Sequence, residues 1–258
     1  GFTILGSTGV HMRFAPDAAA VRLNPDRTGY VMAFPGSAYG QIQTNMAATL
    51  NIDWMLDLAR ELLESQGVAR ARADLLEGLD DRIVAARPGA ALYHPYISPA
   101  GERGPFTEPD ARASFTGLAQ GTGWFDLMRA VFEGLALAAR DCYAAMGPVP
   151  YEIRLTGGAA RSAAARRILA AALNAPVRTV DQPEAGAAGA AMIAALGAGL
   201  AESPDTVATA WVAPRLGPTE APDADLAAIY DALFPAFVAT REALAPAWTA
   251  LAETRRRA

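Results

Sequence analysis

Two glycine turns contain the residues of this sequence with the clearest chemical potential. The first turn is Gly6-Ser7-Thr8-Gly9, where two hydroxyl groups and flexible backbone N–H groups could donate hydrogen bonds to phosphate oxygens. The second is Gly157-Gly158-Ala159-Ala160-Arg161-Ser162, which closes an expected strand and opens an expected helix, a position that favours anions. Alone, each has an ordinary reading as a hairpin turn or a helix start. Together they indicate a site that holds a polyphosphate.

The composition excludes several other chemistries. All 22 basic residues are arginine, so neither a Walker A loop nor a Schiff-base lysine can occur in these 258 residues. Cys142 is the single cysteine, which excludes an internal disulfide and a cysteine-rich zinc site. His11 and His94 lie far apart with no ligand spacing around them, and we expect no metal site from protein side chains.

Charge and hydropathy also limit the partners. The formal net charge of −5 gives no excess of positive charge for binding nucleic acid. The longest apolar stretch, 185–200, consists mostly of alanine and glycine and is too short to span a bilayer. With one free cysteine and no signal peptide, the sequence predicts a cytoplasmic protein without a membrane partner.

The elements that must position the two turns follow from periodicity. Strands are expected at 2–5 and 10–14, joined as a hairpin by the first turn, and at 30–34. The apolar residues Met46, Leu50, Trp54, Leu58 and Leu62 predict a helix over 45–66. Further along we expect a loop at 94–110, helices at 125–146, 162–173 and 183–199, and strands at 90–93, 151–156 and 177–180.

This order predicts an α/β fold in which a mixed sheet, with at least one parallel pair of strands, is flanked by helices. Residues 1–200 are expected to form one domain. A Pro-rich linker at 201–222 would then lead to a carboxy-terminal helix at 223–258 that packs on the same domain.

Five stretches resemble one known family in the order in which they occur. Leu5-Gly6-Ser7-Thr8-Gly9-Val10 is similar to the phosphate hairpin of the FGGY carbohydrate kinases, and 155–162 to their adenosine motif. The spacing from Ala113-x-Phe115-x-Gly117-Leu118 through Asp126 to Glu133 fits the family's second signature. The stretches 94–106 and 183–191 resemble two further family segments. This resemblance implies the actin-like ATPase, ribonuclease H-like fold and ATP with Mg²⁺ as cofactor.

The resemblance also implies roles for individual residues. Ser7 or Thr8 would contact the β- and γ-phosphates; position favours Ser7, and the choice stays open. Gly157, Gly158 and the following Ala159 would line the α-phosphate and ribose. Ser162, Thr49 and Asp53 would lie around the adenine.

The same resemblance implies that the catalytic base is an aspartate upstream of the phosphate hairpin. We expect that base before Gly1, in an amino-terminal domain that binds most of the substrate, so residues 1–258 contain no catalytic residue and should be inactive alone. The substrate class is a sugar or a polyol, with erythritol or a pentulose favoured, and a homodimer stays open. The alternatives are a degenerate kinase half serving as a binding or regulatory module, and a hydrolase of the same fold. The hydrolase would need a pair of carboxylates near the hairpin, which the sequence lacks.

Overall fold

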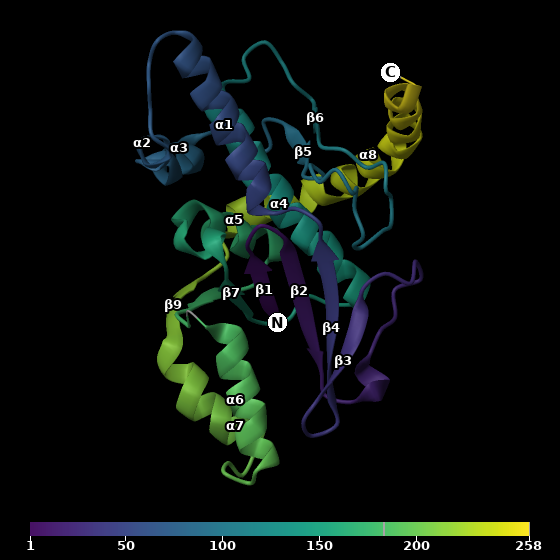
Figure 1. Cartoon of the computed structure of the whole chain (residues 1–258), viewed down its shortest axis with the longest axis vertical. Coiled ribbons are helices and arrows are strands. Elements are labelled where there is room, and N and C mark those ends of the chain that lie inside the picture. Colours follow the sequence, from purple (N-terminus) through teal and green to yellow (C-terminus); the bar gives the residue numbers. More distant parts are fainter. Residues whose placement is uncertain (183, 258) are drawn as a thin grey trace.

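The computed structural model describes residues 1–182 and 184–257, and its centre is a mixed seven-stranded sheet (Figure 1). The strand order is β3-β4-β2-β1-β7-β8-β9. Neighbouring strands are antiparallel from β3 to β1, parallel from β1 through β7 to β8, and antiparallel again at β9. The α/β fold with a mixed sheet and parallel pairs is thereby confirmed. The strands are β1 Phe2–Leu5, β2 Gly9–Ala15, β3 Tyr30–Phe34, β4 Ala38–Asn45, β7 Ile153–Thr156, β8 Val177–Val180 and β9 Leu216–Glu220.

The expected hairpin is present and occupies the middle of the sheet. Leu5 pairs with Gly9, which leaves Gly6, Ser7 and Thr8 as the connecting turn. On its other side β1 runs parallel to β7, so the residues after both strands come out at the same edge. The two glycine turns follow these two strands, and the topology therefore brings them together.

Strand β4 was not expected, and it includes Asn45, the first residue of the helix predicted over 45–66. Gln41, Gln43 and Asn45 are buried on this strand although they are polar, because loops and neighbouring strands satisfy their side chains. A buried face made of amides hides the alternation by which a strand is usually recognised. The helix α1 begins only at Thr49 and ends at Ser65.

Helix α4, Trp124–Met146, is the central helix of the domain. It packs across β2 and β4 and also contacts α1, α3, α5 and α8. Val131, Leu135, Ala138 and Cys142 of the predicted apolar stripe are buried, as are residues on its other faces. The remaining α-helices are α2 Arg72–Leu76, α3 Leu79–Ala85, α5 Ala163–Leu173, α6 Ala185–Gly197, α7 Pro204–Val207 and α8 Ala224–Arg257. A small second sheet pairs β5 Leu92–His94 with β6 Ser114–Thr116.

The apolar stripe predicted for α1 lies on the wrong side of that helix. Leu50, Trp54 and Leu58 are exposed, whereas Ile52 and Met55 face the core. Because apolar residues occur on both faces, the spacing correctly predicted a helix but not its buried side.

The expected linker at 201–222 is structured. Helix α7 and two short helical turns fill its first part, and β9 joins the sheet beside β8. Prolines at a sheet edge do not interrupt a ladder when their missing N–H would face outward. The expected terminal helix is α8. The prediction of a helix start at Pro183 falls outside the described residues. Within residues 1–182 and 184–257, none of the helices combines the length and apolar character needed to cross a bilayer.

An arm made of α6 and α7 extends away from the sheet (Figure 1). Helix α6 contains only alanine, glycine, Met192, Ile193 and Leu196, and none of its residues is buried. It packs on α7 rather than on the central layer.

Candidate functional site

The first glycine turn is held against the start of α1 by its own carbonyl groups. The backbone N–H of Ala48 donates to the Ser7 carbonyl at 2.8 Å, and that of Thr49 donates to the Gly6 carbonyl at 2.8 Å. The Thr49 hydroxyl donates to the same Gly6 carbonyl, also at 2.8 Å. With these carbonyls engaged behind the turn, the side chains of Ser7 and Thr8 are exposed in front of it.

The second glycine turn lies directly against the first. Gly157 has φ of +96°, a conformation that L side chains rarely adopt. A Cβ there would lie 2.5 Å from the Leu5 carbonyl oxygen and 3.0 Å from the Gly6 nitrogen. Gly158, the next residue, is exposed, and a Cβ added to it would be 4.0 Å from the Thr49 methyl group. The structure thus brings the two turns and Thr49 together at one edge of the sheet.

The second turn does not open α5 directly, as the sequence suggested. A 3₁₀ turn, Gly158–Arg161, intervenes, and Ser162 caps α5 by accepting the Ala165 N–H at 3.0 Å. The next free N–H, that of Ala163, donates to the Asp80 carboxylate at 2.7 Å, and the Ser162 hydroxyl donates to it at 2.6 Å. A carboxylate of α3 therefore already occupies the helix terminus, and an anion must be held by the glycine pair instead. Ala159 is buried and can offer only its backbone.

This cap gives a stability prediction. Replacing Ser162 by alanine removes the acceptor for Ala165 and the donor to Asp80, so we expect a loss of about 1 kcal/mol in unfolding free energy. Denaturant titration measures it. The control is Ser65→Ala, which removes an exposed hydroxyl at the end of α1 and should cost less than about 0.5 kcal/mol. Equal losses in both variants would contradict the capping role.

Asp53 lies one helical turn after Thr49 on α1, but its carboxylate is engaged. It forms an ion pair with Arg72 of α2, and both side chains are partly exposed. A base bound beside Thr49 would therefore meet an Arg72–Asp53 pair rather than a free carboxylate.

Behind the hairpin a buried network supports β2. The ring of His11 contacts Asn45 at 3.0 Å through Nε2 and Thr3 at 3.3 Å through Nδ1. Burial lowers the pKa of His11 to about 4, so the ring is neutral at physiological pH. Thr3 in turn contacts the Tyr143 hydroxyl at 2.9 Å. His11 is therefore a structural residue of the strand.

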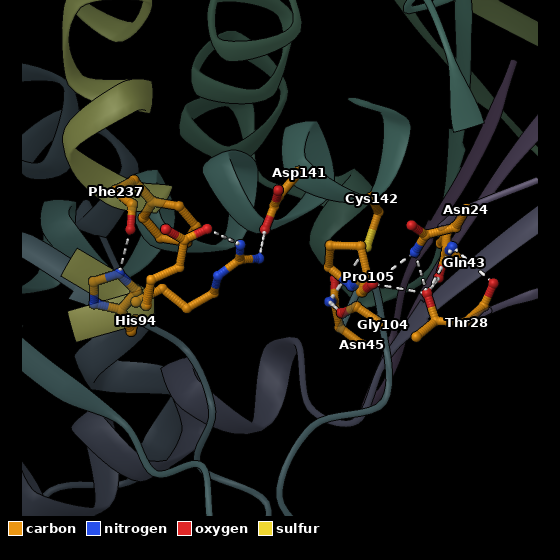
Figure 2. A network of polar contacts seen from close by, with 12 residues as sticks. Asn24, Thr28, Gln43, Asn45, His94, Gly104, Pro105, Asp141, Cys142 and Phe237 are labelled. Atoms are coloured by element: carbon orange, nitrogen blue, oxygen red, sulfur yellow. Dashed lines mark hydrogen bonds and ion pairs between the residues drawn. The ribbon is translucent and has the colours of Figure 1, made fainter. Parts of the chain in front are cut away.

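The loop expected over 94–110 is ordered and is fastened to the sheet (Figure 2). His94 contacts the Phe237 carbonyl of α8 at 2.9 Å, and Asn45 donates to the Gly104 carbonyl at 2.8 Å. The carbonyl of Pro105 accepts from Thr28 at 2.7 Å and from Asn24 at 2.8 Å. The loop therefore connects α8 with the strand that leads into α1.

The sequence did not identify Asp80 or Asn45 as candidate residues. Asp80 lies 82 positions from Ser162, and only the packing of α3 on α5 joins them. Asn45 was assigned to a helix. No local pattern marks such contacts, because each partner comes from a distant part of the chain.

The residues at this edge fit a polyphosphate better than a metal ion. The exposed hydroxyl groups, and the backbone N–H of an exposed glycine, can donate hydrogen bonds to phosphate oxygens. In the part of the chain that the structure describes, no group of three or more His, Cys, Asp or Glu side chains could hold a metal.

Comparison with known proteins agrees with this geometry. Residues 1–198 match the FGGY family of carbohydrate kinases, C-terminal domain. An erythritol kinase of Brucella abortus (strain 2308) is 53% identical over 253 residues, which cover 98% of this chain and 48% of that protein. A gluconokinase of Bacillus licheniformis is 32% identical over 194 residues, covering 71% of this chain and 35% of that protein. The chain thus spans about half the length of the first of these curated relatives, and less of the second.

Among solved structures, a ligand-bound xylulose kinase from Lactobacillus acidophilus superposes with a TM-score of 0.81 at 22% identity. The match covers 97% of this chain and 48% of that one. At this level of identity the likeness concerns the fold, and it agrees with the actin-like, ribonuclease H-like arrangement expected from the sequence.

Proposed function

Because the chain belongs to the FGGY family of carbohydrate kinases and corresponds to their carboxy-terminal domain, we propose that it is the nucleotide-binding half of an ATP-dependent kinase. The substrate we favour is a four-carbon polyol, erythritol, in line with the erythritol kinase that is 53% identical; a pentulose is the alternative. A cytoplasmic location and the absence of nucleic-acid and membrane partners remain predictions from the sequence.

One observation supports the nucleotide site above all others. Gly157 lies against the backbone of Leu5 and Gly6, and Gly158 lies beside the Thr49 methyl group, so two turns from distant parts of the chain form one continuous edge. Mg-ATP, when bound there, would supply the γ-phosphoryl group and the cation that offsets its charge. Ser7 or Thr8 would hold the terminal phosphates, Gly157 and Gly158 the inner phosphate and ribose, and Thr49 the approach to the base.

The remaining site residues have more limited roles in this proposal. Ser162 would support this edge by capping α5, and Ala159 would support it as a buried residue of the 3₁₀ turn. Asp53 would lie near the adenine through its ion pair with Arg72.

The catalytic base, which removes the proton from the substrate hydroxyl, belongs by the family resemblance upstream of the hairpin. We therefore expect residues 1–258 to bind nucleotide and to phosphorylate nothing by themselves.

Calorimetry and a coupled assay test this proposal. Residues 1–258 should bind MgADP and should show no phosphorylation of erythritol in the coupled assay. Turnover by residues 1–258 would contradict the assignment of the base. If MgADP neither releases heat nor raises the melting temperature, the binding or regulatory module without catalysis becomes the better reading.

The two hydroxyls of the first turn can be separated by matched variants. We expect one of Ser7→Ala and Thr8→Ala to weaken the binding of a non-hydrolysable Mg-ATP analogue about tenfold, because a hydrogen bond to a charged phosphate is lost. The other should change affinity less than about twofold. If both variants bind as the wild type does, the hairpin is not the phosphate site.

A further inference from the structure

The loop that crosses the end of β4 approaches this strand closely. A Cβ on Gly104 would lie 2.5 Å from the Thr44 carbonyl oxygen, so the loop backbone rests on the strand itself. The contacts from Asn45 to Gly104 and from Thr28 to Pro105 fasten it there (Figure 2). Any change in this loop must reach the end of β4.

Glu102, two residues before Gly104, is a buried carboxyl group at this junction. Glu102 as a whole is only 1% exposed. Oε1 accepts the Met46 N–H at 2.9 Å and the Arg103 N–H at 2.8 Å. Oε2 is also buried and has no hydrogen-bond partner among the described residues. A buried carboxyl oxygen without a donor is costly when it is charged.

Met46 is the first residue after β4 and starts the connection to α1. Two and three residues later, the N–H groups of Ala48 and Thr49 hold the carbonyls of Ser7 and Gly6. Glu102 therefore holds one end of this connection through Met46. The other end, through Ala48 and Thr49, holds the turn proposed to bind phosphate.

We propose that Glu102 is a positioning residue of the nucleotide site, whose buried carboxyl group fixes the β4–α1 connection and thereby the Gly6-Ser7 turn. The proposal deepens the function proposed above and, for nucleotide binding, rests on it. Glu102 does not touch the turn, so it acts through the backbone of residues 46–49.

The surroundings of Glu102 favour the neutral form. Burial raises its pKa to about 7, against the opposing effect of nearby backbone N–H groups and the Asn45 side-chain amide. The titratable groups that interact with it are Tyr96 of the same loop and Cys142 of α4. Asp141, the neighbour of Cys142 on α4, is paired with Arg241 of α8. The folded chain thus binds this proton more tightly than the unfolded chain does. This contribution to stability is complete below the ordinary pKa of 4.5 and is lost as the pH rises to and through about 7.

Hydrogen exchange of the full chain tests the positioning without nucleotide. In Glu102→Ala, the amides of Ala48 and Thr49 should exchange about tenfold faster than in the wild type, although neither donates to Glu102. Glu108→Ala is the matched control, because the Glu108 side chain accepts the Asp110 N–H within the same loop, and its backbone contacts with Glu102 and Ala111 are kept in the variant. Unchanged exchange in Glu102→Ala, or equal acceleration in Glu108→Ala, overturns the proposal.

Glu102→Gln keeps the Oε1 acceptor and stays neutral at every pH, so it remains informative if the alanine variant does not fold. At pH 6 its Ala48 and Thr49 amides should exchange like those of the wild type. At pH 8.5 the wild type should exchange severalfold faster than Glu102→Gln and should melt at a lower temperature. Matching behaviour of the two proteins across this range contradicts the role of the neutral form.

MgADP affinity completes the test. We expect a Kd about tenfold higher in Glu102→Ala, and a ratio of wild-type to Glu102→Gln Kd that rises from about 1 at pH 6 to severalfold at pH 8.5. Comparison with the Gln variant cancels the titration of ADP itself. If the wild type binds no MgADP, the proposed function fails, while the exchange experiment still decides whether Glu102 positions the turn.

Discussion

Replacing Gly157 by alanine should weaken MgADP binding about a hundredfold. The added Cβ would lie 2.5 Å from the Leu5 carbonyl oxygen and 3.0 Å from the Gly6 nitrogen, closer than non-bonded atoms approach. Both neighbours are backbone atoms of the central hairpin and cannot rotate away. The φ of +96° adds strain for any residue with a Cβ. The second turn must then move away from the first, and the site proposed between them opens.

Gly121→Ala is the matched control because it adds the same methyl group to an exposed glycine outside the proposed site. Its Cβ meets nothing within 4 Å, and its φ is not in the left-handed region. We expect a change in MgADP affinity of less than about twofold. Calorimetry on both variants, with circular dichroism to show that each is folded, makes the comparison. Equal affinities for the two would mean that the contact between the turns does not form the site.

Replacing Glu133 by alanine should cost about 3–5 kcal/mol in unfolding free energy, because it leaves the charge of Arg129 buried without a partner. The Arg129 Nε donates to Glu133 Oε1 at 2.7 Å, and both side chains are 4% exposed. Tyr230 of α8 donates to the same oxygen at 2.9 Å, and Gly89 donates to Oε2 at 3.1 Å. A single carboxylate therefore joins α4, α8 and the loop after α3.

The control for this prediction is an ion pair of the same spacing in solvent. Glu64→Ala removes one of the two acidic partners of Arg60 on α1, at 3.1 Å and with side chains 51% and 44% exposed. That loss should be far smaller than the loss in Glu133→Ala, because solvent screens the exposed pair. Denaturant unfolding of both variants decides the matter. A loss below about 1 kcal/mol in Glu133→Ala would show that the buried guanidinium finds compensation among the carbonyls of Ile83, Val84 and Ala86, which it already contacts.

The parts of the fold that could be predicted are those encoded locally. Strands β1 and β2 are short runs of strand-forming residues joined by a glycine turn. Helix α4 repeats apolar residues over 23 positions. Strand β4 could not be predicted in this way. Its buried residues are glutamine and asparagine, whose burial depends on Arg13, Thr28 and Gly104, partners that lie elsewhere in the chain.

The candidate site divides along the same line. Both glycine turns were visible because glycine in a turn is a local requirement, and their adjacency followed from the parallel pairing of β1 with β7. Asp80 was not visible, and it changes the chemistry expected at α5, since it fills the helix terminus that an anion would otherwise occupy. The contact of Glu102 with Met46 could not be predicted either, because it depends on a loop that crosses a strand absent from the sequence prediction.

The arm formed by α6 and α7 implies that two parts of this domain unfold with different free energies. Its first helix buries no residue, so little free energy opposes its separation from the sheet, whereas α4 is buried on nearly every side. Amides of 185–197 should therefore exchange through local opening, at rates that ligands at the hairpin leave unchanged. Melting temperatures will report the sheet and α4, and proteases will cut first in the arm.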